Sequence, residues 1–360
     1  MARKKTIFVA AGASGGHVFP ALATAEELKK KGYACVFVMG GGKFGHVVEA
    51  AGFKVERLPA AAFANRGVVR LAAAGIKLAA GLLKALWLVG KYKPVAAFGT
   101  GGYATVATMM ACKMRGVPTV IHNADAILGR ANRLLARWVK VVLLTFEGTP
   151  VPETNARVRV VGTPLRKEVL AARKRKREED GTFRLLVLGG SQGARIMSDV
   201  VPEAVAMLTA RQRARVVVVQ QARAEDVARV QNAYAQLGLA GYEVRAFFED
   251  LPRKYVDAHV VIGRSGVGTL LEAATLGRAA IYCPHRLADN HQLFNAQVAE
   301  RAGAAVVMEQ PYFTPANLLV QVKALMADRT RVEAMEAAAK KLARPNAARD
   351  AADVVVEVAG

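Results

Sequence analysis

The sequence predicts an α/β protein with two Rossmann-like, doubly wound domains that each contain a parallel sheet. Short apolar runs alternate with longer helical patterns along the chain, as expected for strands that are buried on both faces. A glycine-rich segment follows the first run at Gly12, and another follows at Gly189, 177 residues later. A length of 360 residues favours two domains over one. The same architecture is therefore expected twice.

Apolar or β-branched runs in both halves are expected to form strands. Those of the first half are Ile7–Ala10, Ala34–Met39, Val95–Phe98, Thr119–Ile121 and Val139–Leu144. Those of the second half are Leu185–Leu188, Arg215–Val219, Val244–Phe247, Val260–Ile262, Ala279–Tyr282 and Ala305–Met308. After Pro315 the pattern is helical with a break near Pro345, so two closing helices are expected.

The boundary between the halves is expected at Gly162, where glycine and proline end the first alternating pattern. A basic run from Arg173 to Arg177 follows. It contains no aromatic residues and is followed at once by Glu178, Glu179 and Asp180, so a solvated loop is favoured over a nucleic-acid site.

The composition narrows the possible classes of partner but does not select one of them. The chain has 51 Lys and Arg against 29 Asp and Glu, a net charge of +22, which suits nucleic acid, an anionic membrane surface or a phosphorylated substrate. With 53% apolar residues the chain is not disordered. Three distant cysteines support neither disulfides nor a zinc site. Glycines interrupt both long uncharged runs, 6–25 and 94–112, so no transmembrane helix is expected.

The two glycine loops are interpreted as phosphate cradles at the start of a helix. Each also matches the GxSxG turn of serine hydrolases, but a hydrolase needs one such turn and a later acid and histidine that nothing here singles out. The glycine spacing of nicotinamide-binding proteins and the Walker sequence are both absent.

A third segment, 263–272, follows the strand Val260–Ile262. Ser265 and Gly266 would open a helix whose free N–H groups face an anion, and Arg264 adds a fixed positive charge. Glu272, two turns along, could accept both hydroxyls of a ribose. An ordinary helix cap and a solvated glutamate are the alternative. The polar cluster 289–295 opens another helix and is suited to sugar hydroxyls.

Together these segments resemble the MurG family of peptidoglycan glycosyltransferases. The resemblance lies in Gly12–Ala21, Gly101–Tyr103, Gly189–Arg195 and Arg264–Gly266, and their order and spacing match over essentially the whole chain. It implies a GT-B fold with two domains facing a cleft. Residues 1–162 would bind the acceptor and the membrane, residues 163–334 would bind the donor, and a C-terminal helix from about 335 to 360 would cross back to the first domain.

The resemblance implies an inverting transfer of N-acetylglucosamine from UDP-N-acetylglucosamine to a lipid-linked muramyl-pentapeptide, with no metal or other cofactor. Arg264 and the backbone near Phe248 would meet the uracil, Glu272 the ribose, Ser191 to Gly193 the diphosphate and Gln292 the sugar. The complete donor set is Gly190, Ser191, Gln192, Gly193, Phe248, Arg264, Ser265, Gly266, Glu272, Asp289, Gln292 and Asn295.

His17 is the candidate base, because the reference pKa of histidine lies near the operating pH, and Asp125 is the alternative. The implied acceptor-binding residues are Ser14, Gly15, Gly16, Gly101, Gly102, Tyr103 and Arg166. Three departures from the family pattern concern acceptor identity and sugar choice. They are Ala13-Ser14 in the first loop, His122-Asn123-Ala124-Asp125 where the family has His-Glu-Gln-Asn, and His291-Gln292 in place of paired glutamines.

Other activities stay open from the sequence. They are a glycolipid synthase with another lipid acceptor, an epimerase or hydrolase acting on UDP-N-acetylglucosamine, and a non-catalytic subunit that binds nucleotide or membrane.

The segment 63–93 suits a helix that lies in a membrane interface. Arg70, Lys77, Lys84 and Lys91 recur every seven residues, with leucines and Trp87 between them. An ordinary helix packed on the sheet would show the same pattern. The expectation is peripheral binding to the cytoplasmic face of the plasma membrane, without nucleic acid, and other cell-wall synthesis proteins are further candidate partners.

Overall fold

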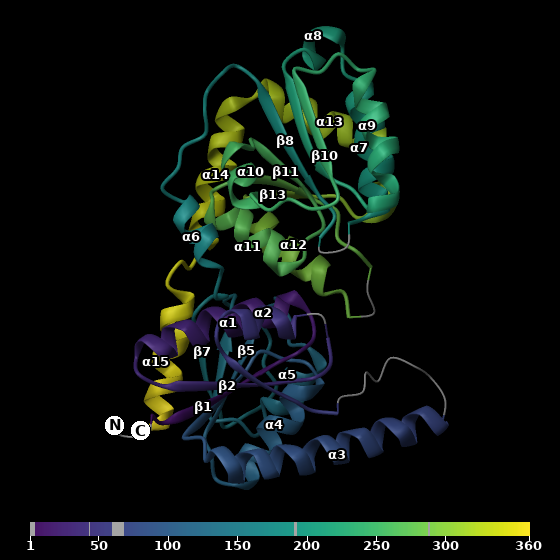
Figure 1. Cartoon of the computed structure of the whole chain (residues 1–360). Helices are drawn as coiled ribbons and strands as arrows, with labels where there is room; N and C mark the ends of the chain where they lie inside the picture. The colour runs from purple at the N-terminus through teal and green to yellow at the C-terminus, as the bar shows by residue number, and fades with distance from the viewer. Residues whose placement is uncertain (1–3, 43, 60–67, 191–192, 287–288) are drawn as a thin grey trace. The chain divides into compact units, whose positions relative to one another are not determined.

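The computed structural model describes residues 4–42, 44–59, 68–190, 193–286 and 289–360, and for 68–77 it describes the backbone alone. The chain forms two compact units (Figure 1). Unit 1 contains Met1–Arg166 and Arg344–Gly360, and unit 2 contains Lys167–Ala343. From the sequence, the first unit was expected to end at residue 162 and the chain to return to it at about residue 335. In the structure these two transitions lie later, after Arg166 and after Ala343.

Unit 1 is built on a parallel seven-stranded sheet with the order β3-β2-β1-β4-β5-β6-β7. Its strands are β1 (Thr6–Ala11), β2 (Ala34–Met39), β3 (Lys54–Arg57), β4 (Ala96–Gly99), β5 (Thr119–Asn123), β6 (Val141–Leu144) and β7 (Arg157–Val160). Its helices are α1 (Gly15–Lys30), α2 (Gly45–Ala50), α3 (Val68–Tyr92), α4 (Tyr103–Met114), α5 (Arg130–Leu135) and α15 (Ala347–Ala359).

Both faces of this sheet are buried. Ile7 and Val9 of β1 join a core with α1 and α15, whereas Phe8 and Ala10 join a second core with α3 and α4. Figure 1 shows α1 and α15 on one side of the strands and α3 and α4 on the other. Alternate residues of one strand therefore serve two cores, which explains why the strand is apolar throughout.

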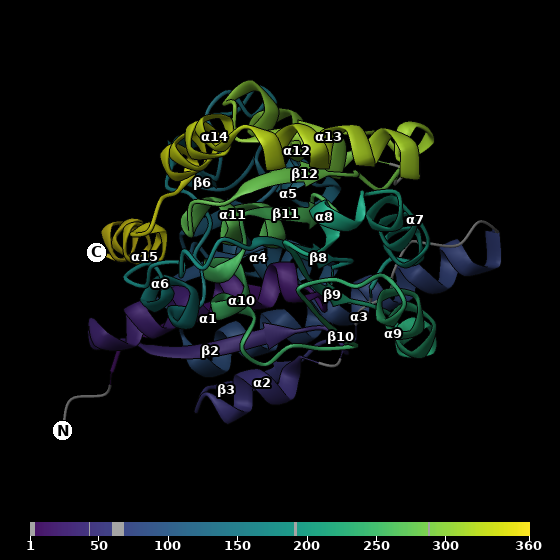
Figure 2. The same cartoon turned by 90° about the horizontal axis from the view of Figure 1, so that it is seen from above.

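Unit 2 contains a parallel six-stranded sheet with the order β10-β9-β8-β11-β12-β13. Its strands are β8 (Phe183–Leu188), β9 (Val216–Gln221), β10 (Gly241–Arg245), β11 (Val260–Gly263), β12 (Ala279–Tyr282) and β13 (Ala305–Val307). Its α-helices are α6 (Lys167–Ala172), α7 (Arg195–Ala206), α8 (Ala210–Arg213), α9 (Val227–Ala235), α10 (Leu251–Asp257), α11 (Val267–Thr275), α12 (His291–Arg301), α13 (Pro315–Ala327) and α14 (Arg329–Leu342). Helices α7 and α13 pack together on one face of the sheet (Figure 2).

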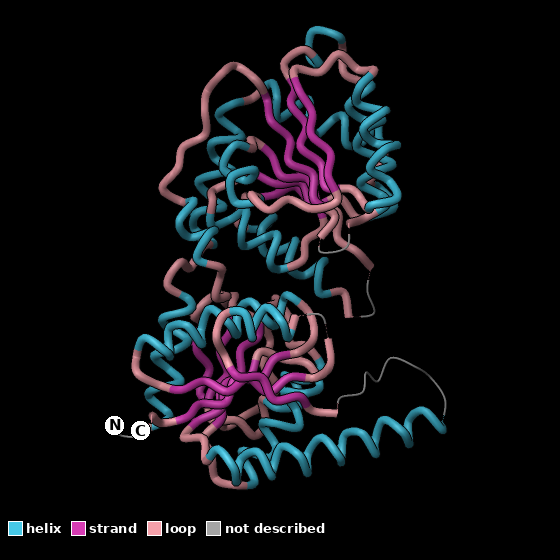
Figure 3. The backbone as a smooth tube through the Cα atoms, viewed as in Figure 1, coloured by secondary structure: helices cyan, strands magenta, loops and turns pink. Residues whose placement is uncertain are grey.

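The predicted fold class is confirmed, since each unit contains a sheet of parallel strands with helices packed around it (Figure 3). The predicted strand Val244–Phe247 was misplaced, because β10 spans Gly241–Arg245 and Phe247 is 71% exposed. The prediction of two closing helices was also wrong. Three are present, because the chain breaks at Asp328 as well as before α15.

Both sheets place their first strand in the middle and build outward in two directions. The order reverses between β1 and β4 in unit 1, and between β8 and β11 in unit 2. At such a point the loops that leave two neighbouring strands diverge, and α/β proteins bind ligands there at the carboxyl ends of the strands. The glycine segments singled out from the sequence occupy both of these positions.

Candidate active site

In unit 1, two glycine loops meet at the carboxyl ends of β1 and β4. A Cβ atom on Gly102 would lie 2.6 Å from the Cα atom of Gly12, and one on Gly12 would lie 2.7 Å from the Nδ1 atom of His17. Gly101 and Gly102 have φ angles of +108° and +86°, which disfavour residues with a side chain. The glycines thus make room for an imidazole ring between two loops.

His17 lies in the first turn of α1, and its position is fixed on several sides. Its Nδ1 atom is 2.9 Å from the Ser14 hydroxyl, and its backbone N–H donates to the Ser14 carbonyl at 3.0 Å. The Thr100 hydroxyl donates to the His17 carbonyl at 2.9 Å. For Nε2 to accept a proton, Nδ1 must carry the other hydrogen and donate it to Ser14. The Ser14 hydroxyl can accept that hydrogen, so this contact is compatible with a free acceptor at Nε2.

The neighbouring loop of unit 1, which carries Asp125, is held by buried amides. The Asn123 side chain donates to the carbonyls of Asp125 and Ile127 at 2.7 and 3.1 Å, and it accepts from the Gly129 N–H at 3.2 Å. Asn132 of α5 donates to the His122 carbonyl at 2.9 Å. Sequence reasoning missed Asn132, because an asparagine within a helix rich in arginine carries no pattern that marks it as buried.

His122 is fully buried at the end of β5. Its Nε2 atom lies 2.8 Å from the Gly162 carbonyl, so Nε2 carries the hydrogen and donates it. Burial is the main cause that lowers the pKa of His122 to about 4, with the hydrogen bond to Gly162 opposing it and the nearby His17 adding to it. His122 is therefore neutral at physiological pH and holds the loop rather than exchanging protons.

The remaining predicted acceptor residues surround these loops. Gly15 and Gly16 form the start of α1, whose first turn contains no acidic residue and whose cap, Ser14, makes no side-chain capping bond. Tyr103 begins α4 and is 36% exposed. The Arg166 guanidinium lies 5.5 Å from the ring centroid of Phe19 on α1.

In unit 2, the equivalent glycine loop connects β8 to α7. Gly190 and Gly193 have φ angles of +82° and +73°, and the Gly193 N–H donates to the Gly190 carbonyl at 3.1 Å. A Cβ atom on Gly189 would lie 2.6 Å from the Cα atom of Gly193. Ser191 and Gln192 lie outside the described residues. The cap of α7, Ala194, has no side-chain acceptor, so the first N–H groups of this helix receive no side-chain cap.

Arg264 extends from the end of β11 and is buried, with 8% of its surface exposed. Its guanidinium donates to the Cys283 carbonyl at 3.0 Å, the Cys283 thiol at 3.3 Å and the Gln310 side-chain oxygen at 3.0 Å. Within the described part of the chain, no carboxylate lies within ion-pair distance of Arg264. Burial lowers the pKa of Arg264. A buried cation without an anion is costly, which suits a site that receives an anionic ligand.

The start of α12 is tied to the loop after β11. The Ser265 hydroxyl donates to the Gln292 carbonyl at 2.7 Å, and the Asn295 side chain donates to the Ser265 carbonyl at 3.3 Å. The Gln292 side-chain oxygen accepts from the His285 N–H at 2.9 Å. Asn295 is fully buried, so its role in unit 2 includes holding these elements together. Asp289 lies 3.4 Å from the His291 imidazole.

Other predicted donor residues lie on α11 and near α10. Gly266 caps α11 without a side-chain acceptor, and Glu272 lies within this helix. Phe248 is 5% exposed, and the Lys254 ammonium lies 5.9 Å from its ring centroid. Its neighbour Phe247 is a candidate that sequence reasoning missed, because it was counted as part of a strand. The two adjacent phenylalanines shortly after the end of β10 were the signal that could have identified it.

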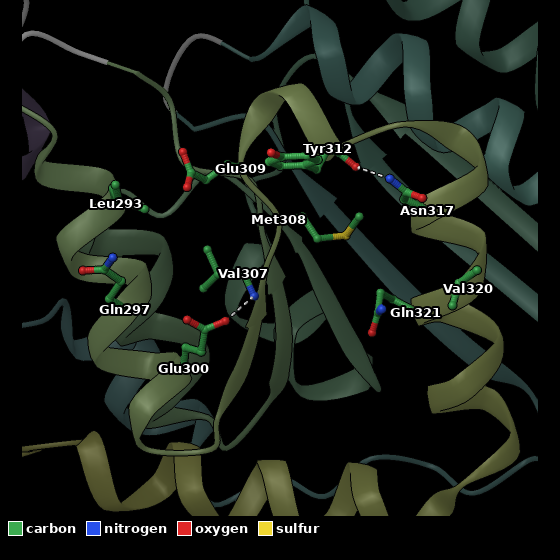
Figure 4. A pocket seen from close by; sticks show the side chains of 10 residues that line it. All are labelled: Leu293, Gln297, Glu300, Val307, Met308, Glu309, Tyr312, Asn317, Val320 and Gln321. Atoms are coloured by element: carbon green, nitrogen blue, oxygen red, sulfur yellow. Dashed lines mark hydrogen bonds between the residues drawn. The ribbon is translucent and has the colours of Figure 1, made fainter.

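Two further grooves of unit 2 lie beside the edge strand β13. One of about 430 Å³ lies between α12, β13 and α13, where Glu300 accepts from the Val307 N–H at 3.3 Å (Figure 4). The other, of about 320 Å³, is lined by Pro284, His285 and Arg286 and shares Leu293 and Glu309 with the first. None of the described donor candidates lines either groove, so neither groove coincides with the candidate donor site at the carboxyl ends of β8 and β11.

Helix α3 has one buried and one exposed side. Ala85, Leu88 and Val89 are buried against the sheet, whereas Leu83 and Trp87 are 68% and 58% exposed. Lys84 is also exposed, and the Lys91 ammonium lies 4.7 Å from the Trp87 ring centroid. The side chains of Arg70 and Lys77 lie outside the described residues. Among the described helices, none is long and apolar enough to cross a bilayer.

In the described parts of both units, no three histidine, cysteine or carboxylate side chains lie together as a metal site requires.

Comparison with known proteins identifies two matching family models. The glycosyltransferase family 28 N-terminal domain matches residues 7–144, and the family's C-terminal domain matches residues 184–353. A protein of Rhodopseudomonas palustris (strain BisA53) is 41% identical over 98% of this chain and 96% of its own length. A protein of Methylobacterium nodulans is 42% identical with the same coverage. Both are named UDP-N-acetylglucosamine--N-acetylmuramyl-(pentapeptide) pyrophosphoryl-undecaprenol N-acetylglucosamine transferase.

Solved structures show the same architecture. The crystal structure of Acinetobacter baumannii MurG matches with a TM-score of 0.83 and 29% identity, over 98% of this chain and 99% of the other. A UDP-GlcNAc 2-epimerase from Neisseria meningitidis matches with a TM-score of 0.67 and 13% identity, over 98% and 99% of the two chains. At that identity the epimerase shares the fold alone.

Proposed function

The chain belongs to glycosyltransferase family 28, and from this premise we propose that it moves N-acetylglucosamine from UDP-N-acetylglucosamine to the lipid-linked muramyl-pentapeptide. Relatives about 40% identical over 98% of the chain are named for this transfer. The acceptor is the undecaprenyl-diphosphate-linked muramyl-pentapeptide of those names. The product carries both sugars on the same lipid.

The observation that best supports donor binding in unit 2 is the unpaired, buried cation of Arg264. It lies at the carboxyl end of β11, next to the uncapped start of α11 and one strand from the glycine loop after β8. A diphosphate carries the negative charge that these groups lack. The resemblance implies that Arg264 meets the uracil, but its buried charge and neutral partners favour the diphosphate instead. We therefore assign the diphosphate to Arg264, Gly266 and the Gly190 to Gly193 loop, and the ribose to Glu272.

The sugar and the uracil would occupy the flanks of this site. Gln292 and Asp289 at the start of α12 supply polar groups for sugar hydroxyls, and the backbone at Phe248 supplies hydrogen bonds for uracil. Phe247 offers an exposed aromatic ring beside it. Asn295 supports the sugar site by holding α12 against Ser265.

In the reaction, the acceptor hydroxyl oxygen forms a bond to C1 of the sugar while the bond from C1 to the diphosphate breaks. UDP leaves with the bonding electrons, and the hydroxyl proton passes to a base. We assign the base to His17, in the tautomer whose Nδ1–H donates to the Ser14 hydroxyl and leaves Nε2 free to accept the proton. Asp125 is the alternative base, and its backbone carbonyl accepts a hydrogen bond from the Asn123 side chain. The starts of α7 and α11 and the Arg264 guanidinium stabilise the charge of the departing diphosphate.

The acceptor's own diphosphate would bind at the start of α1, near Ser14, Gly15 and Gly16. The Gly101 and Gly102 loop, Tyr103 and Arg166 would surround the rest of its headgroup. A lipid-linked acceptor requires access to a membrane, and the exposed face of α3 offers Leu83 and Trp87 with Lys84 and Lys91 beside them. Peripheral binding at the cytoplasmic face follows from this proposal.

One assay tests the proposal. The protein is incubated with radiolabelled UDP-N-acetylglucosamine, with and without the muramyl lipid acceptor, and the lipid phase is separated by chromatography. Label that moves to the lipid only when acceptor is present is the expected result. Turnover of the donor without acceptor would indicate an epimerase or hydrolase, transfer to diacylglycerol would indicate a glycolipid synthase, and binding without turnover would indicate a recruiting subunit.

A further inference from the structure

We propose that Gln310 is a positioning residue for the donor, because its neutral side chain holds the Arg264 guanidinium without cancelling its charge. The proposal rests on the assignment of the donor diphosphate to Arg264. It concerns the turn η2 (Gln310–Tyr312), which follows β13 and contains none of the motifs that drew attention in the sequence.

Every acceptor that the structure gives Arg264 is uncharged in its usual state. They are the Cys283 carbonyl at 3.0 Å, the Cys283 thiol at 3.3 Å and the Gln310 amide oxygen at 3.0 Å. Burial raises the pKa of the Cys283 thiol to about 11, so it stays protonated near neutral pH. The guanidinium is therefore held in place while its full charge remains available to a ligand.

A carboxylate lies next in the chain but points elsewhere. Glu309, directly before Gln310, lines the groove beside β13 (Figure 4). Its carboxylate lies 3.4 Å from the Arg286 guanidinium. Glu309 is the cap of η2 and Gln310 is its first residue, and the contacts of their side chains place Glu309 at the groove and Gln310 against Arg264. The turn thus places an amide, and not an acid, against the buried cation.

The backbone of Gln310 is anchored in the turn. The Phe313 N–H donates to the Gln310 carbonyl at 3.3 Å, and the Phe313 side chain is buried with 2% exposure, which anchors the turn. A guanidinium only donates hydrogen bonds, so it must face the side-chain oxygen of Gln310, and the amide NH₂ group points away from it. A glutamate at this position would keep the acceptor and add the missing negative charge.

The test replaces Gln310 by glutamate in the full chain. An internal ion pair should raise the melting temperature, because it removes an uncompensated buried charge. It should also weaken UDP binding by roughly tenfold to a hundredfold, the size of one charge-assisted contact, while uridine binding changes little. Calorimetric titration with UDP and with uridine gives the affinity ratio. Gln236→Glu is the matched control, an exposed glutamine at the end of α9, and should leave that ratio unchanged.

Gln310→Leu is the second variant, which keeps the test decisive if the glutamate variant does not fold. It removes the acceptor, so the melting temperature and the UDP-to-uridine affinity ratio should both fall. A purely structural role would change stability and leave the ratio as in the parent, and that outcome in either folded variant overturns the proposal. If the parent itself binds no UDP, the donor assignment fails and not only the role of Gln310.

Discussion

Unit 1 and unit 2 have the same strand order around their central strands, and both place a glycine loop where that order reverses, but the groups beside the two loops differ. In unit 1 the imidazole of His17 lies against Gly12 and Gly101 and is within hydrogen-bond distance of the Ser14 hydroxyl. In unit 2 the loop lies one strand from the buried cation of Arg264, which has neutral partners only.

The comparison separates what the fold supplies from what the side chains supply. The fold supplies two sets of helix N-termini and glycines that allow close approach of a ligand. The side chains then specialise the two positions, since an imidazole can move a proton near neutral pH whereas a guanidinium cannot. Under the proposed function, unit 1 activates the acceptor and unit 2 holds the donor.

The largest expected effect is that of removing the base. His17→Ala should lower turnover by about 10² to 10⁴ with UDP affinity unchanged, because a base acts in the transition state. Steady-state transfer to the lipid acceptor and calorimetry with UDP measure the two quantities. The exposed histidine of α2 provides the control, His46→Ala, which should keep full activity. Full activity of His17→Ala would transfer the role to Asp125, and Asp125→Asn would then test it.

Membrane binding should belong to unit 1 alone. Replacing Lys77, Lys84 and Lys91 by glutamate should weaken binding to anionic vesicles by roughly a hundredfold, since each basic residue near such a surface contributes about 1 kcal/mol. Flotation with anionic vesicles at low and high salt is the measurement. The same exchange at Lys174, Lys176 and Lys323, exposed lysines of unit 2, is the control and should leave flotation nearly intact. Equal flotation of the two triple variants would show that the exposed face of α3 does not bind lipid.

Donor affinity should depend on unit 2. Arg264→Ala and Glu272→Ala should each weaken UDP binding roughly tenfold to a hundredfold, because each removes one charge-assisted contact of about 1.5 to 3 kcal/mol. Uridine binding should fall with Glu272→Ala but change less with Arg264→Ala, since only the diphosphate needs the cation. Isothermal titration measures both ligands, and Arg286→Ala, an exposed arginine of the same unit, is the control. UDP affinity at the parental value in both variants would place the donor elsewhere.

The last expected effect is on acid stability and not on activity, and in this respect the two units are alike. Burial lowers the pKa of His122 in unit 1 and of His259 in unit 2 from 6.5 to about 4. Below pH 6.5 the unfolded chain binds a proton that the folded chain excludes, so stability falls until about pH 4 and is fully present above that window. The slope for the fully buried His122 is at most about 1.4 kcal/mol per pH unit. His122→Asn should flatten the pH dependence of the melting temperature, and an unchanged slope would contradict the assignment.

The fold was predictable where strands are buried on both faces. β1, β8 and β11 are apolar at nearly every position, so their existence follows from the sequence. The edge strands β3 and β7 were missed, because one side of an edge strand meets solvent and the sequences Lys-Val-Glu-Arg and Arg-Val-Arg-Val resemble loops. Charge on a strand is normal at an edge, and it hides the strand from a search for apolar runs.

The site was predictable in its backbone but not in its side-chain partners. Gly12, Gly102 and Gly193 could be found because close approach and positive φ angles require glycine. The burial of Arg264 against Cys283 and Gln310 could not be predicted from the sequence. These two residues lie 19 and 46 positions after Arg264 and meet it only through the packing of β11, β12 and η2. Polar contacts between distant elements leave no periodic pattern in the sequence.

Helix α15 has a consequence for how the protein is made. It packs on α1 within a core that includes β1, and Glu357 joins Arg157 and Arg159 of β7 at 2.7 and 2.8 Å. On the ribosome, residues 167–343 emerge before this helix. Unit 2 therefore has its whole sequence available while unit 1 still lacks α15, which covers part of its core. Unit 1, whose first strands are synthesised before unit 2, is therefore completed after it, and the face of its sheet that α15 covers stays open until residues 347–359 have left the ribosome.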